Sequence, residues 1–443
     1  MKLHLTRIAI AIMLLTGCNN NPMSDKFRGD NLNSGNYNAG TVVTEPVELW
    51  KFKTSSNINA SPVFDGESIY IGSADHYFYS FEAKTGQLNW KYKTEGKIYS
   101  TAIINQNSVL FLSYDGFLYN LNRKTGELIW KFKTEGEEEH MIKNYYDLND
   151  KVGDFWDFYQ SSPAIDSNNI YFGCGELIYA VNLNSGEEKW RYKTEGAVHS
   201  SPAIKDNKIV IGSFDSRVYC LDSESGKEEW IYETGRDTTQ YVWLGVQASP
   251  AISGDSVFIG SRDALIYCFS LNSGDTIWTN NNFNRSWMPS SFAIGDKLYC
   301  GSSDGFSFYA INKEDGEIDY TAKTHSYTFS SPAVSSNMAY IGSANGRLYA
   351  IDLKHEKIAW EYLTHGAKTD TINIYNDHGA MDAERFKVLA KKMELNNYSK
   401  LVDFYKLYFK SSGAIVSSPV IYDGIIYFTS MDGYIYAITN KNK

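Results

Sequence analysis

The sequence predicts an all-β chain that folds as one eight-bladed β-propeller, with the ring closed by an N-terminal strand. Three observations lead to this fold class. A tryptophan recurs at intervals close to 40 residues, a pattern of four short runs fills most intervals, and complementary fragments of that pattern stand at the two ends of the chain. Recurrence of one four-stranded unit is the sequence signature of a propeller.

Each unit predicts one four-stranded antiparallel meander. The unit from Ser201 to Trp230 is complete: Ser-Pro-x-aliphatic, a polar turn, an aliphatic run ending in Gly-Ser, a second turn, an alternating run, a Ser-Gly turn and the Trp strand. The apolar period is two, which excludes an α-helical solenoid. The aromatic residues of the fourth strands are Trp50, Trp90, Trp130, Trp190, Trp230, Trp278, Tyr320 and Trp360.

The chain ends predict how the ring closes. The last unit begins at Ser418 and stops near Ile438 without a Trp strand, whereas residues 47–52 form a Trp strand with no unit before it. Pairing these fragments completes an eighth blade and closes the ring through backbone hydrogen bonds. The propeller is therefore expected to span residues 46–443, with a small helical insertion near residues 380–410.

The Trp strand resembles the tryptophan-docking motif of quinoprotein propellers. That motif has a small residue, a glycine six positions later and a tryptophan ten positions later, as in Ala180, Gly186 and Trp190. Tyr320 in place of Trp and Glu356 in place of Gly are two departures, at which we expect looser docking between blades.

The cysteines inside the repeats are predicted to be buried thiols. Cys220 and Cys268 occupy the small-residue slot of the motif, and Cys174 and Cys300 also fall within repeat strands. No adjacent Cys pair and no Cys-x-x-Cys spacing occurs in the sequence, so no metal site is predicted from the cysteines.

The N-terminus predicts a lipoprotein signal peptide over residues 1–17. Lys2 and Arg7 precede a short apolar run, and Leu15-Thr16-Gly17-Cys18 resembles the bacterial lipobox, which implies lipidation at Cys18. Residues 18–45 are rich in Asn, Gly and Ser and are expected to form a flexible tether. The net charge of -10 argues against nucleic-acid binding.

Three blade junctions are expanded, at residues 137–160, 236–247 and 367–416. Links from a fourth strand to the next first strand leave the ring on one face, so we expect the insertions to meet there. Their aromatic residues either grip a partner or pack the insertions onto the propeller. The candidate binding rim consists of Trp156, Tyr159, Tyr241, Trp243, Tyr405 and Tyr408.

A second candidate site is the mouth of the central channel. The residue three positions before each blade's Pro slot should form a ring of mixed polar and aromatic side chains, with no carboxylate among them. These side chains either contact a ligand or fill a narrowing funnel. The candidate mouth residues are Asn59, Tyr99, Gln160, His199, Gln247 and Phe329, with Pro289 and Val416 completing the ring.

The lipobox and the eight blades together resemble the BamB family of propeller lipoproteins of the outer-membrane β-barrel assembly machinery. The resemblance implies a non-enzymatic, monomeric scaffold without cofactor or metal, held by a lipid anchor at the periplasmic side of the outer membrane, with an envelope protein as partner. The alternatives are a pyrroloquinoline quinone-dependent dehydrogenase and a lipoprotein that binds a glycan or small ligand. Those dehydrogenases use adjacent cysteines and a carboxylate-held calcium, which the sequence does not predict here.

Overall fold

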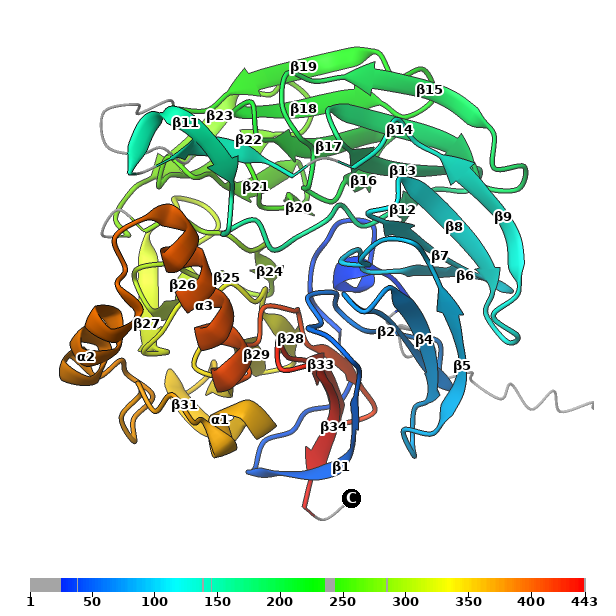
Figure 1. Ribbon diagram of the computed structural model, residues 1–443. Coiled ribbons are helices and arrows are strands. Elements are labelled where there is room, and N and C mark those ends of the chain that lie inside the picture. The colour runs from blue at the N-terminus through cyan, green and yellow to red at the C-terminus, as the bar shows by residue number, and fades with distance from the viewer. Residues whose placement is uncertain are drawn as a thin grey trace, which may run out of the picture.

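The computed structural model describes residues 25–37, 39–137, 139–144, 146–235, 244–283 and 286–441. Within these residues, eight four-stranded antiparallel sheets stand around a central axis, which confirms the predicted propeller (Figure 1). We number the sheets as blades 1 to 8 in chain order. The first strand of each blade lies nearest the axis (Figure 1), and from blade 4 to blade 8 the first strands of neighbouring blades contact one another.

Blades 1 to 4 consist, from inside to outside, of β2 (Val63–Phe64), β3 (Ser68–Gly72), β4 (Tyr77–Glu82) and β5 (Leu88–Lys93); β6 (Ile103–Asn105), β7 (Ser108–Ser113), β8 (Phe117–Asn122) and β9 (Leu128–Lys133); β12 (Ala164–Ile165), β13 (Asn169–Cys174), β14 (Leu177–Asn182) and β15 (Glu188–Lys193); and β16 (Ala203–Lys205), β17 (Lys208–Ser213), β18 (Arg217–Asp222) and β19 (Glu228–Glu233).

Blades 5 to 8 consist of β20 (Ala251–Ser253), β21 (Ser256–Gly260), β22 (Ile266–Ser270) and β23 (Thr276–Asn280); β24 (Ala293–Ile294), β25 (Leu298–Gly301), β26 (Ser307–Ile311) and β27 (Ile318–Lys323); β28 (Ala333–Ser335), β29 (Met338–Gly342), β30 (Arg347–Asp352) and β31 (Lys357–Leu363); and β32 (Val420–Tyr422), β33 (Ile425–Thr429), β34 (Tyr434–Asn440) and β1 (Pro46–Lys53).

The ring closes as the sequence predicts. β1 pairs antiparallel with β34, with Trp50 opposite Ala437, so that the two chain ends form one blade. Figure 1 shows the blue N-terminal strand beside the red C-terminal strand at the edge of blade 8. Backbone hydrogen bonds between the first and last strands therefore lock the ring.

The docking glycines lie so close to the neighbouring blade that a side chain would not fit. Gly86 lies against the indole of Trp50 on the preceding blade, and a Cβ at Gly86 would stand 2.5 Å from that ring. The Trp50 indole N–H donates to the carbonyl of Ala83 at 2.8 Å. The same Gly–indole contact recurs at Gly126, Gly186, Gly226, Gly274 and Gly316.

The two departures from this motif meet at one junction. Tyr320 on blade 6 packs against the β30–β31 hairpin of blade 7, and Glu356 occupies the glycine slot of that hairpin with a left-handed φ of 50°. Burial first, and then the negative charge of Glu356, raises the pKa of the Tyr320 hydroxyl. The missing indole and the missing glycine therefore lie at the same blade junction.

The hydroxyl of the Ser-Pro motif links each blade to a neighbour around the channel. The Ser162 N–H donates to the hydroxyl of Ser201 at 2.9 Å, and the Ser201 N–H donates to that of Ser249 at 2.8 Å. The Ser418 N–H donates to Ser61 at 2.8 Å across the ring closure. A Ser or Thr hydroxyl occupies this position in all eight units. Its role as a hydrogen-bond acceptor between blades was not predicted from the sequence.

The expectation of a flexible tether is wrong for the part of residues 18–45 that the structure describes. Residues 25–37, which we call the N-terminal plug, lie across the end of the channel where the inner strands finish, and contain the short 3-10 helix η1 (Phe27–Gly29). Carbonyls of the plug accept the N–H groups of Ile104, Ile204, Ile252, Ile294 and Val334, which are all inner-strand residues. Residues 18–24 lie outside the described part of the chain.

Arg28 fixes the plug in the lower mouth of the channel, the mouth where the inner strands end. Arg28 is 2% exposed, and its guanidinium donates to the carbonyls of Phe292 at 2.7 Å and Pro332 at 2.5 Å. Burial lowers the pKa of Arg28 to about 10. Farther along the chain, the Val42 carbonyl accepts the indole N–H of Trp360 at 2.9 Å, a bond that a blade hairpin provides elsewhere.

The four cysteines that the structure describes are free and buried, which confirms their prediction as core thiols. Cys220, Cys268 and Cys300 are fully buried and Cys174 is 2% exposed.

Candidate functional site

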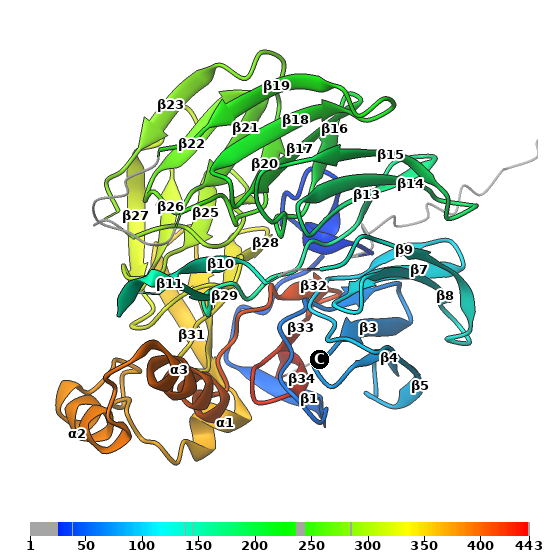
Figure 2. The same cartoon turned by 45° about the horizontal axis from the view of Figure 1, so that its top comes forward.

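Two insertions cover the upper mouth of the channel, where the inner strands begin. The first insertion (residues 137–160) forms a hairpin of β10 (Met141–Asn144) and β11 (Asp147–Gly153), which sequence analysis did not predict. The third insertion (residues 367–416) carries the predicted helices. These are α2 (Ala383–Met393) and α3 (Tyr398–Ser412), preceded by α1 (His365–Thr369), which begins in the adjoining link. Figure 2 shows the hairpin beside α3 on the same face of the ring.

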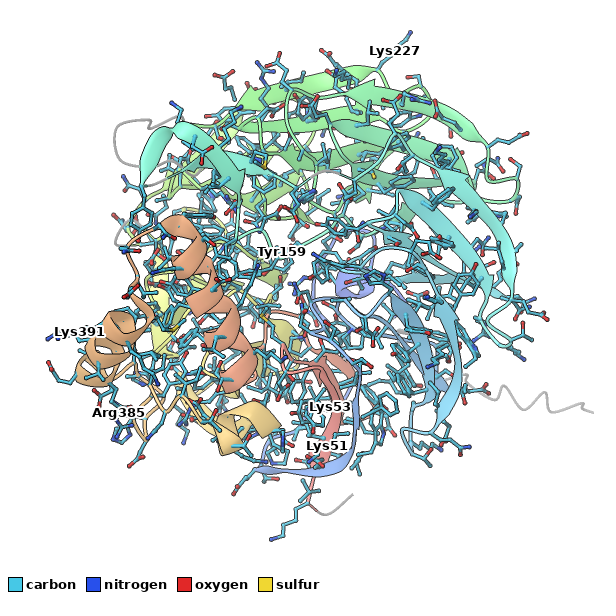
Figure 3. The ribbon with its side chains drawn as sticks, in the orientation of Figure 1. Lys51, Lys53, Tyr159, Lys227, Arg385 and Lys391 are labelled. Carbon is cyan, nitrogen blue, oxygen red and sulfur yellow. The ribbon has the colours of Figure 1, made fainter. Side chains whose placement is uncertain are left out.

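Local sequence signals begin and end these helices. The Asp382 carboxylate accepts the N–H groups of Glu384 and Arg385 at the start of α2, and Asn397 caps α3 in the same way. Gly413 ends α3 in the left-handed conformation. Arg385 and Lys391 on α2 point away from the ring (Figure 3), and α2 has no buried residue, so α3 is the helix that packs on the propeller.

The two insertions meet each other, as expected for links that leave one face. The Tyr398 hydroxyl of α3 donates to the Gly153 carbonyl at 2.7 Å and accepts the Phe155 N–H at 3.1 Å. The ring of Phe155 stacks on Phe409 with 5.9 Å between centroids. Most of the second insertion, including Tyr241 and Trp243, lies outside the described residues.

The predicted aromatic rim divides into buried and accessible members. Tyr408 is 1% exposed, packs under α3 and shares a hydrogen bond with Ser326 at 3.2 Å, so it is not part of an exposed rim. Tyr159 lies over the centre of the ring (Figure 3), and its hydroxyl donates to the Phe329 carbonyl. Trp156 and Tyr405 are half-buried, and both line a pocket between the insertions and the blades.

The channel-mouth ring holds the first insertion. Asn59 donates to the Phe158 carbonyl at 3.1 Å, and Gln247 donates to the Trp156 carbonyl at 3.2 Å. Gln160 accepts the Ser100 N–H at 3.1 Å. Between this ring and Phe27 of the plug, the channel keeps a free volume of only about 20 Å³.

His199 of the mouth ring lies in a buried group of charges that the first insertion brings to the mouth. Its Nδ1 lies 2.6 Å from Asp157 and its Nε2 lies 3.2 Å from Glu137. Burial alone would lower the pKa of His199, but Asp157 and Glu137 outweigh burial and raise it well above its usual value. The ring positions themselves carry no carboxylate, but the first insertion brings the carboxylates of Asp157 and Glu137 to the mouth from outside the repeat.

A second buried ion pair anchors the other side of the first insertion. Arg262 contacts the Asp154 carboxylate, and its Nε donates to Gln247 at 3.0 Å. Burial raises the pKa of Asp154, although Arg262 opposes this shift. Nearby, His140 stacks on Phe214 at 3.8 Å, and burial lowers the pKa of His140 to about 2, so its ring is neutral.

The insertions leave two hollows open on this face. A wide cleft of about 1190 Å³ lies between the β10–β11 hairpin, α3 and blades 1, 2 and 8. Its walls carry both lysines, such as Lys97 and Lys406, and carboxylates, such as Glu139 and Asp432. A smaller pocket of about 280 Å³ lies between α3, the first insertion and blades 5 to 7. In the part of the chain that the structure describes, no group of three or more His, Cys, Asp and Glu side chains is arranged to hold a metal ion.

The comparisons with known proteins agree with the repeat. The family model described as "Outer membrane protein assembly factor BamB" matches residues 42–280 and 262–392. The chain belongs to this family. A comparison with curated protein sequences gives no match.

Solved structures share the fold at low sequence identity. BamB from Moraxella catarrhalis has a TM-score of 0.65 and 14% identity, over 89% of this chain and 100% of that chain. A europium-containing methanol dehydrogenase has a TM-score of 0.68 and 11% identity, over 94% and 98%. A quinohemoprotein alcohol dehydrogenase from Comamonas testosteroni has a TM-score of 0.69 and 11% identity, over 95% of this chain and 81% of that chain. BamB-family membership and the propeller fold are therefore both established, and the propeller is shared with quinone-dependent enzymes.

Proposed function

We propose that this BamB-family protein is a non-enzymatic, membrane-anchored scaffold that binds a protein partner in the cell envelope, in the assembly of outer-membrane proteins. One observation carries the proposal: two insertions join over the upper mouth into one surface, while the plug fills the lower mouth. The non-repeating part of the chain thus builds a broad outer surface above a closed channel.

The composition of that surface suits a protein partner. Met141 on the hairpin and Leu407 on α3 are 47% and 46% exposed, beside half-buried aromatic rings and the lysines of the wide cleft. Interfaces between proteins combine apolar and aromatic centres with polar rims. We place the partner site on the β10–β11 hairpin, α3 and the cleft between them.

Attachment to the membrane is part of the proposal and rests on Cys18, which lies outside the described residues. Among those that the structure describes, no helix is long and apolar enough to cross a bilayer. Several acyl chains on one cysteine hold a protein firmly at a membrane. Cys18→Ser should move the protein from the membrane fraction to the soluble fraction, and a variant that stays membrane-bound would refute the anchor. We favour the periplasmic side of the outer membrane.

The partner site is tested with two matched pairs of surface changes. Met141→Glu with Leu407→Glu places charges on the insertion face, whereas Ile129→Glu with Ile277→Glu places them on outer blade strands at 50% and 51% exposure. We expect the first pair to lose co-purification of β-barrel assembly proteins from cross-linked envelopes, and the second pair to retain it. Loss only in the second pair would place the partner on the blade edges.

A quinone-dependent oxidoreductase is the second candidate, favoured by the shared propeller of the two dehydrogenases. At the upper mouth, the carboxylates of Asp154 and Asp157 contact Arg262 and His199 of the protein itself. An absorbance spectrum recorded after addition of pyrroloquinoline quinone and calcium distinguishes the two functions. We expect the spectrum of the free quinone, and a shifted, saturable spectrum would favour the enzyme.

A further inference from the structure

The smaller pocket on the insertion face has walls of aromatic rings from three separate parts of the chain. Trp156 comes from the first insertion, Tyr405 from α3, and Tyr327 from the link between blades 6 and 7. Trp287 and Phe329, from two blade links, complete the walls, with 5.9 Å between their ring centroids. The pocket exists only where the insertions meet the blades.

Three of the rings, those of Trp156, Tyr327 and Tyr405, are inclined to one another, whereas Phe329 lies parallel to Tyr327 at 8°. Trp156 is inclined by 47° to Tyr327 and by 63° to Tyr405, with ring centroids 5.2 Å and 4.7 Å apart. Tyr327 and Tyr405 are inclined by 77°. Inclined aromatic rings around a small volume present several π-faces to one bound group, which is how proteins hold quaternary ammonium ions.

One carboxylate on the pocket wall has no cation beside it. Asp304, in the β25–β26 turn, accepts the Ser303 hydroxyl at 3.0 Å, and no Lys, Arg or His among the described residues lies within ion-pair distance of it. Desolvation by the surrounding pocket wall raises the pKa of Asp304, although the residue lies in an exposed turn. Asp304 lines the same pocket as Tyr327 and Tyr405. After the larger effect of burial, its charge also helps to raise the pKa of both tyrosines.

The cation that lines the pocket is already neutralised. The Arg262 guanidinium lies 4.9 Å from the Trp287 ring centroid, its side chain is 1% exposed, and it is paired with Asp154. Among the described residues that line the pocket, Asp304 therefore has no cation beside it, because Arg262 is paired elsewhere. The surroundings of the pocket therefore favour a positive ligand.

We propose that this pocket binds a small organic cation that carries an ammonium group, held against Trp156, Tyr327 and Tyr405 and paired with Asp304. The volume of about 280 Å³ suits a small molecule. The proposal goes beyond the scaffold function and does not depend on the identity of the protein partner. Partner capture and cation binding are measured separately, so either can fail alone.

The test is calorimetric titration of the full-length protein in detergent with choline, tetramethylammonium and 1,5-diaminopentane. The neutral control is 3,3-dimethylbutan-1-ol, which has the shape of choline without its charge. We expect saturable binding of at least one cation, and binding of the alcohol at least ~10-fold weaker than that of choline, because cation–π attraction and the carboxylate both require charge. Equal affinity for choline and the alcohol would overturn the proposal.

Variants assign the binding to this pocket. Asp304→Asn removes the charge at an exposed turn and should weaken cation binding about 10-fold. As the control, Asp403→Asn makes the same change on the exposed surface of α3 outside the pocket and should leave cation binding unchanged. Trp156→Phe keeps an aromatic ring with a weaker π-face and should weaken choline binding at an unaltered melting temperature. Unchanged affinity in Asp304→Asn, or no binding of any of the three cations at millimolar concentration, would refute the site.

Discussion

The repeated blades and the added segments of this molecule are held together by different kinds of contact. Each blade is docked by a motif that recurs along the chain, such as the indole of Trp50 against Gly86. The added segments use single contacts that occur once: the plug through its backbone carbonyls and Arg28, and the first insertion through His199 and Arg262. Periodicity therefore reveals the ring, whereas the parts that distinguish this chain from a plain propeller leave no periodic signal.

We expect the largest loss of stability when the ring is opened by removing β1, the strand that closes it. Deleting residues 18–56 removes β1 and exposes the edge of β34, so we expect loss of cooperative unfolding or aggregation. Deleting residues 18–40 keeps β1 and should give a folded ring with a lower melting temperature, because the plug is lost. Thermal unfolding followed by circular dichroism compares the two, and equal melting would show that β1 does not lock the ring.

A slightly smaller loss of stability is expected when the buried charges that hold the first insertion are disrupted. His199→Gln leaves Asp157 and Glu137 without their cation, which should lower the free energy of unfolding by about 3 kcal/mol. Because the folded state raises the pKa of His199, its contribution is complete below the unfolded value of about 6.5 and is lost as pH rises through the raised pKa.

The difference in melting temperature between wild type and His199→Gln should therefore shrink at alkaline pH. Exposed His355 pairs with Asp352 at 2.7 Å, and His355→Gln serves as the control with little effect. A difference that grows with pH would contradict the assignment of a charged His199.

At the plug, Arg28→Ala leaves the carbonyls of Phe292 and Pro332 buried without donors. We expect a loss of about 2 kcal/mol in the free energy of unfolding. Lys26→Ala, at a half-buried neighbour that contacts Asn31 within the plug, should cost less than about 0.5 kcal/mol. Chemical denaturation measures both, and equal losses would show that Arg28 does not anchor the segment.

The smallest effect concerns the junction of Tyr320 and Glu356. Tyr320→Trp alone should be destabilising, because the new indole meets the Cβ of Glu356, whereas Tyr320→Trp with Glu356→Gly restores the docking pair. We expect a coupling of about 1 kcal/mol between the two changes. Additive effects in a double-mutant cycle would mean that the two residues changed independently.

The ring and the helical insertion could be predicted because their signals are local. Trp spacing gives the blades, and the apolar runs near residues 380–410 give α2 and α3. The plug could not be predicted, since its bonds to the inner strands come from backbone carbonyls, which any residue supplies. A composition rich in Asn and Gly therefore resembled a tether.

The candidate site was predicted in part. The strand order predicts that the insertions share one face. It does not predict that the Glu137 side chain is buried, because Glu137 lies in an acidic run that resembles a solvated rim. Its partner His199 stands on another blade. Asp304, Trp287 and Tyr327 were missed for the same reason, because they become neighbours only through the packing of α3 and the first insertion.

Site-specific photo-cross-linking tests the central claim, that the joined insertions are the partner surface. A photoreactive residue is placed at Met141 or Leu407 on the insertion face, and at Ile129 or Ile277 on the outer strands as matched controls of similar exposure. We predict adducts with an outer-membrane assembly protein from the first two positions and none from the controls. Adducts from the outer strands alone, in cells where all four variants are folded, would contradict the account.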